Sequence, residues 1–156
     1  LQYRQRMQQL YDVMTFVSLG IAVTLTFSAS LLMERLYGQS YSGSDKVLAV
    51  HIWAGVIVFF GTTRGKWIIA ENLQKKALIV DITGAVLNVI LNLILIPYYN
   101  ALGAAIATLL SYACTILATS IAIKEFREPF VMYMKSFVHC VTLRTIRQLV
   151  AGKYFV

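Results

Sequence analysis

Polar side chains interrupt long apolar stretches of this sequence, and they are the first candidates for chemistry. Asp81, Asn88 and Asn92 recur at helical spacing in one apolar segment, so they fall on one helix face. An amide within hydrocarbon needs a partner helix or a water-filled cavity. Asn88 and Asn92 therefore have two interpretations, hydrogen bonds between helices or the lining of a substrate path. Asp81 lies close to Lys75 and Lys76, and it is either a paired acid at the membrane surface or a proton relay.

Other titratable or cationic side chains lie in or next to the preceding apolar segment. His51 is an ion-pathway candidate because histidine changes charge near neutral pH. It also lies beside Trp53, at a membrane boundary where such side chains gather without a transport role. Arg64 and Lys66 end the segment and are candidates to contact a pyrophosphate group. The alternative interpretation is that both cations only anchor the topology.

Small residues recur at every fourth position of the last apolar segment, where Gly103, Ala107 and Ser111 form a ridge. A ridge of this kind lets a second helix approach closely, so we expect a helix-packing surface.

Signatures of soluble enzymes are missing from the sequence. It has no glycine-rich phosphate loop, no zinc-ligand spacing and no nucleophile elbow. His51 and His139 lie on different elements and cannot form a metal-binding pair on one helix. We expect no catalytic residue, no metal and no cofactor, and therefore no enzyme. Cys114 and Cys140 are expected to be free thiols.

The composition indicates the elements that hold these residues. Of 156 residues, 58% are hydrophobic and 13% are charged, and the mean hydropathy is +0.69. A soluble domain carries about a quarter charged residues. A bilayer core needs about 20 apolar residues per helix, and Pro97 divides the longest apolar block. The sequence predicts an all-α membrane bundle with four transmembrane helices, at about 13–33, 47–63, 77–96 and 102–123.

The net charge of +7 is distributed by loop. The flank 1–12, the connection after the second predicted span and the tail 124–156 are net positive, and the other two connections are neutral. The positive-inside rule then predicts a multi-pass protein with both ends in the cytoplasm. The basic balance is a topology signal and does not indicate nucleic acid.

The basic tail 124–156 has an amphipathic pattern after Pro129. Phe130, Met134 and Val138 fall on one helical face, with Lys135 and His139 mostly on the other. The tail is either an interfacial helix along the anionic inner leaflet or a helix packed on its own bundle.

Two stretches carry a family resemblance, GAVLNVILNLILIP at 84–97 and LGAAIATLLSY at 102–112. Together with YGQSY at 37–41, VLAVHIWAG at 47–55 and WIIAENLQ at 67–74, they resemble the polysaccharide biosynthesis, O-antigen flippase (Wzx-like) family. This family belongs to the multidrug/oligosaccharidyl-lipid/polysaccharide exporter superfamily. The resemblance covers about 10–124 and departs where Tyr99-Asn100 replaces the family's tyrosine-glycine.

The resemblance implies a two-lobed transporter with a central cavity, of which this chain supplies the last helices of the second lobe. The implied substrate is a polyprenyl-pyrophosphate-linked oligosaccharide for O-antigen or lipopolysaccharide synthesis, moved across the bacterial inner membrane. The implied partners are that lipid-linked substrate, membrane lipids and the remaining helices of the transporter.

Three alternatives stay open. A cation-coupled multidrug exporter of the same superfamily favours deep acidic residues, of which the predicted spans offer only Asp81. A membrane-embedded enzyme needs a large outer loop or a carboxylate-rich domain, and this stretch has neither. A non-transporting membrane subunit is the third alternative.

Overall fold

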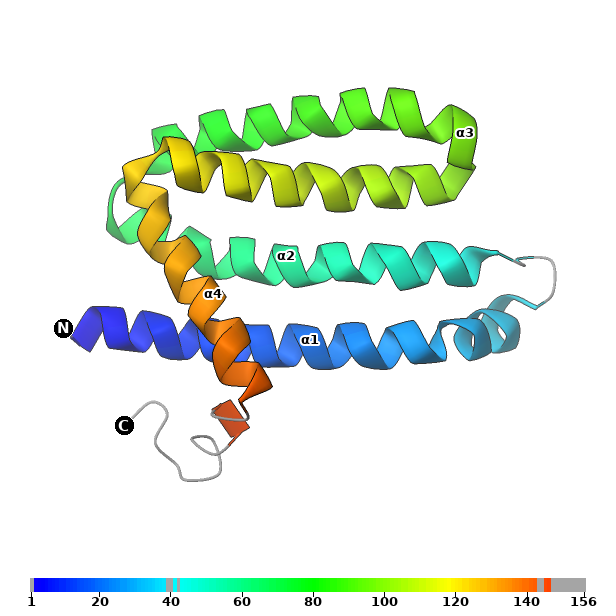
Figure 1. The fold of residues 1–156 in the computed structure, drawn as a ribbon, viewed down its shortest axis with the longest axis horizontal. Helices are drawn as coiled ribbons and strands as arrows, with labels where there is room; N and C mark the ends of the chain where they lie inside the picture. The colour runs from blue at the N-terminus through cyan, green and yellow to red at the C-terminus, as the bar shows by residue number, and fades with distance from the viewer. Residues whose placement is uncertain (1, 39–40, 42, 143–144, 147–156) are drawn as a thin grey trace.

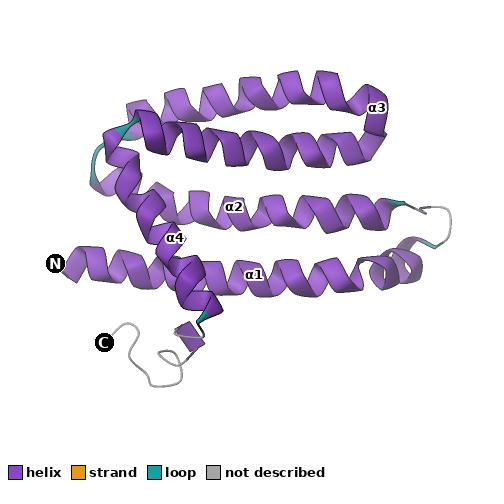
Figure 2. Ribbon diagram, viewed as in Figure 1, coloured by secondary structure: helices purple, strands orange, loops and turns teal. Residues whose placement is uncertain are grey.

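The described part of the chain is helical. The computed structural model describes residues 2–38, 41, 43–142 and 145–146. No strand occurs among them (Figure 2), which confirms the all-α prediction. The elements are α1 (Gln2–Tyr37), α2 (Ser44–Ala70), α3 (Gln74–Ala122), the short 3-10 helix η2 (Lys124–Phe126) and α4 (Arg127–Val141).

Three helices, α1, α2 and α3, are long and apolar enough to cross a membrane. At a rise of 1.5 Å per residue, the 49 residues of α3 would extend about 74 Å, more than twice the thickness of a bilayer core. α3 instead folds back on itself, so that its two arms run side by side in opposite directions (Figure 1). The predicted spans 77–96 and 102–123 are these two arms, and the spans 13–33 and 47–63 lie within α1 and α2.

The reversal of α3 takes place at Asn100, whose φ of 50° and ψ of −132° interrupt the helical backbone. Asparagine tolerates positive φ better than most residues. Pro97 was expected to end the helix at Ile96, but helical geometry continues through Pro97 and breaks three residues later. Proline has a helical φ, and membrane helices tolerate it where neighbouring groups satisfy the backbone group that it leaves without a hydrogen bond.

The hairpin is closed by contact between its arms at Gly103. A Cβ at this position would lie 2.4 Å from the Leu95 carbonyl oxygen. Ala107 and Ser111, the other residues of the predicted ridge, are also buried. The second arm can therefore return close to the first only because position 103 has no side chain.

α2 lies between α1 and the α3 hairpin (Figure 1). Small side chains of α1, among them Ser18, Ala22 and Ala29, are buried, whereas Phe27 is 87% exposed. On α3, Leu93 is 73% exposed. In a membrane these outer apolar faces would contact lipid, while the small buried residues of α1 let a neighbouring helix approach closely.

α4 crosses α1 obliquely near the end that holds the N-terminus (Figure 1). Met132, Tyr133 and Ser136 of α4 are buried. The centroid of the Tyr133 ring lies 4.3 Å from the centroid of the Phe60 ring on α2. Of the two interpretations of the tail, the described residues show the helix packed on its own bundle. Val138 on its outer side is 60% exposed. The tail residues 143–144 and 147–156, which include Arg144 and Arg147, lie outside the described residues.

Gly103→Ala is expected to destabilise the protein by about 1–3 kcal/mol, because its methyl group overlaps the Leu95 backbone and forces the arms apart. Gly55→Ala is the control, since a Cβ there meets nothing within 4 Å. Denaturation in mixed detergent micelles measures both variants. Equal stability of the two variants would contradict the close contact at Gly103.

Candidate substrate groove

A groove of about 670 Å³ opens between α2 and the two arms of α3. Its walls combine apolar side chains with hydroxyl, amide and charged groups. Arg64 and Asp81 are the charged residues of this lining. The polar residues are Thr62, Asn88, Thr108, Tyr112 and Thr115. The sequence candidates Arg64, Asp81 and Asn88, which come from two helices, therefore meet in one groove.

Arg64 and Asp81 form a loose and asymmetric ion pair. Arg64 Nη2 lies 3.4 Å from Asp81 Oδ1, and the Arg64 side chain is 11% exposed against 68% for Asp81. The guanidinium also lies over the Phe126 ring, 5.4 Å from its centroid. Arg64 Nε is buried without an acceptor among the described residues. The groove therefore holds a buried cation with an unused donor, paired with an acid that reaches solvent.

Asn88 joins the two arms of α3. Its Nδ2 donates to Ser111 Oγ at 3.1 Å and more weakly to Thr108 Oγ1 at 3.5 Å. Asn92 Nδ2 donates to Asn88 Oδ1 at 2.9 Å. The hydrogen bonds expected of Asn88 are therefore present, and because the residue also lines the groove, its place in a substrate path stays a prediction.

Thr115 is a polar residue of the groove that also continues the small-residue ridge, four positions after Ser111, where the sequence predicted only helix packing. Its Oγ1 is buried and has no partner among the described residues. A Cβ on Gly84 would lie 3.0 Å from this oxygen, so the glycine allows the arms to approach here. Thr108 and Tyr112 were missed, and Thr115 was not expected in a groove, because the pattern of one arm does not show which face the other arm presents.

The other nominated residues lie outside the lining. Asn92 supports Asn88 from one turn further along the first arm. Lys66 is exposed and comes directly after Arg64 and Gly65 of α2, which line the groove. His51 is exposed as well, 13 residues before Arg64 and so about 20 Å from it along α2. The structure thus separates His51 from the polar residues of the groove.

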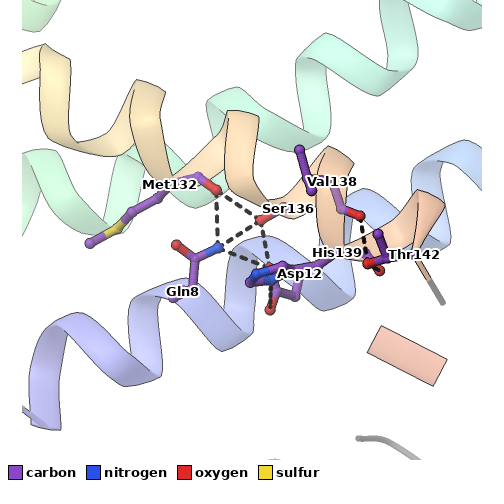
Figure 3. Close-up of polar contacts among 7 residues, drawn as sticks. All are labelled: Gln8, Asp12, Met132, Ser136, Val138, His139 and Thr142. Carbon is purple, nitrogen blue, oxygen red and sulfur yellow. Dashed lines mark hydrogen bonds and ion pairs between the residues drawn. The ribbon is translucent and has the colours of Figure 1, made fainter. Parts of the chain in front are cut away.

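A second polar cluster joins α1 to α4 and was not selected from the sequence (Figure 3). It contains Gln8 and Asp12 of α1 with Ser136 and His139 of α4. Asp12 had been counted only as a charge of the N-terminal flank. Its partners on α4 lie more than 120 residues away, so no local spacing indicated them.

Exposed ion pairs fasten the same end of the molecule. Arg4 Nε lies 2.8 Å from Glu128 Oε1, and Lys76 Nζ lies 2.6 Å from Glu125 Oε1. The hydrogen bond from Lys76 is the main cause that lowers the pKa of Glu125 below its ordinary value. Lys76, which is close to Asp81 in the sequence, thus pairs with Glu125 of η2, and Asp81 pairs with Arg64.

Comparison with protein-family models, curated proteins and solved structures gave no match. Within the described residues, no group of three or more His, Cys, Asp or Glu side chains could hold a metal ion. The groove, the membrane-length helices and the sequence resemblance are the features that bear on function.

Asn88→Ala is expected to destabilise the protein by about 1 kcal/mol, because it removes the hydrogen bonds between the arms to Ser111 and Thr108. Asn92→Ala should lower the free energy of unfolding by less, since Asn92 donates only to Asn88 in the described structure. Unfolding in mixed micelles measures both changes. If Asn88→Ala leaves stability unchanged, the bond to Ser111 does not hold the hairpin together.

Proposed function

We propose that this chain is the C-terminal part of a flippase for a polyprenyl-pyrophosphate-linked oligosaccharide. The observation that carries the proposal is the buried Arg64 guanidinium, with its unused donor, in a groove between membrane-length helices. The resemblance of 84–97 and 102–112 to the O-antigen flippase family supplies the substrate class.

The pyrophosphate of such a substrate would bind at Arg64. A guanidinium donates two parallel hydrogen bonds to phosphate oxygens, and Arg64 Nε and Nη2 are the nitrogens available for that fork. Asp81 holds Nη2 only at 3.4 Å, and its side chain is largely exposed. A phosphate oxygen can therefore replace the carboxylate, which turns away into solvent.

The sugar would lie along the neutral polar side of the groove. Asn88, Thr108, Thr115 and Tyr112 offer amide and hydroxyl groups, which suit the hydroxyl groups of a glycan. The apolar lining, including Ile57 on α2, gives the sugar faces a non-polar surface. The polyprenyl chain would remain in the bilayer, against the exposed apolar faces of the helices.

The proposed orientation has both termini in the cytoplasm of a bacterial cell, with the chain in its inner membrane. The N-terminus, the α2–α3 connection and η2 lie at one end of the bundle (Figure 1). Lys75, Lys76 and Lys124 belong to this end, and the positive-inside rule assigns it to the cytoplasmic side. Arg64 also lies toward it, where a substrate made in the cytoplasm would first meet the groove.

The test is flipping of a fluorescent polyprenyl-pyrophosphate oligosaccharide in proteoliposomes that contain the parent transporter. Arg64→Gln should slow flipping about tenfold or more, because charge-assisted hydrogen bonds contribute about 1.5–3 kcal/mol. Asp81→Asn should bind inorganic pyrophosphate more tightly, since the competing carboxylate is removed.

Lys75→Gln is the matched control, because it removes one exposed positive charge from the same end without touching the groove. Equal flipping by Arg64→Gln and Lys75→Gln would refute the role of Arg64. Transport of small cationic drugs in place of the glycolipid would favour the multidrug exporter, and no transport at all would favour a non-transporting subunit.

A further inference from the structure

A buried acid lies where α4 crosses α1, apart from the residues of the groove. Asp12 is 2% exposed, and Ser136 and His139 of α4 point toward it (Figure 3). Its Oδ1 accepts hydrogen bonds from Ser136 Oγ at 2.7 Å and from Gln8 Nε2 at 2.9 Å. His139 Nδ1 lies 3.0 Å from Asp12 Oδ2. The site surrounds one carboxylate with donors from both helices.

This arrangement suits an ionised carboxylate beside a protonated imidazole. A buried charge is costly unless it is paired, and an imidazolium supplies both the opposite charge and a hydrogen bond. A neutral imidazole keeps at most the hydrogen bond. Histidine is the side chain that gains or loses a proton near neutral pH. We infer that Asp12 and His139 form a proton-binding site and that the bound proton fastens α4 to α1.

The other charged groups along this contact have partners of their own. Arg4 and Glu128 form an ion pair that ties the start of α4 to α1. On α2, Arg64 faces Asp81 and the Phe126 ring. Cys140 lies on α4, and the pKa of its thiol is raised by burial first and by the negative charge of Asp12 second. The pH response near neutrality is therefore assigned to His139, with Cys140 as a reporter of the charge on Asp12.

The proton-binding site has a consequence for motion. α4 follows directly after α3 and η2, and η2 is tied to the first arm of α3 through Lys76 and Glu125. Loss of the proton loosens α4 at its far end, at His139, while the Arg4–Glu128 pair still holds its start. Any role of this loosening in transport rests on the proposed function, but the loosening itself does not.

The test is a distance measurement by pulsed electron paramagnetic resonance on the full chain in lipid vesicles. Spin labels at Val17→Cys and Val141→Cys report on α1 and the far end of α4, with Cys114→Ser and Cys140→Ser as background. Both labelled positions are exposed. We expect a short, narrow distance at about pH 5.5 that broadens toward about pH 8, as histidine loses its proton.

In the His139→Gln and Asp12→Asn variants the distance should no longer depend on pH, because the titrating pair is gone. A second label pair, Val17→Cys on α1 and Val58→Cys on α2, shows whether each variant is folded. The same pH response in folded His139→Gln as in the parent would overturn the inference, and so would no response in the parent.

Alkylation of Cys140 in a Cys114→Ser chain gives an independent reading. In Asp12→Asn the pH profile of the alkylation rate should shift to lower pH, because removal of the negative charge lowers the pKa of the thiol. An unshifted profile would mean that Asp12 carries no charge in the folded chain. Neither measurement needs a substrate, so failure of glycolipid flipping and failure of this site give different results.

Discussion

The fold-back of α3 is the constraint on which the rest of the structure depends. Backbone groups in hydrocarbon must find their hydrogen bonds within a helix, so a helix that is too long for one crossing has to reverse between its two spans, at the membrane surface. Asn100 provides the reversal, and Gly103 lets the second arm start against the Leu95 carbonyl. Because the arms then run side by side, Asn88 reaches Ser111, and the hairpin forms two walls of the groove.

The polar contacts between helices gather at the end of the bundle that holds the N-terminus. Arg64–Asp81 connects α2 to α3, and Asp12–His139 connects α1 to α4. Exposed ion pairs such as Arg4–Glu128 contribute about 0–1 kcal/mol each. The buried groups differ in that a lost partner leaves an uncompensated charge, so they fix which helix meets which. The opposite end has Ser30 bonded to Asp45 between α1 and α2.

Much of the helix pattern, and part of the groove, follows from the sequence. The uncharged blocks locate the membrane helices because a span needs a set length of apolar residues, and helical period places Asp81 and Asn88 on one face. The sequence could not show that Arg64 would be the partner of Asp81, or that α4 would lie on Asp12, because neither pairing depends on local spacing. His51 and Arg64 were both selected as titratable or cationic side chains of one apolar segment. Only Arg64 lines the groove, and His51 lies about 20 Å from it along α2.

The pairing of Arg64 with Asp81 also bears on the electrical behaviour of the proposed carrier. The two charged residues of the groove lining cancel while the groove is empty, so the empty form presents no net charge there. Membrane voltage acts on net charge at about 2.3 kcal/mol per unit charge per 100 mV. For the proposed carrier, the pyrophosphate group would add negative charge to the groove, so an interior-negative potential would favour outward movement of the cargo. The paired charges of the lining would add little to the voltage dependence of the return step.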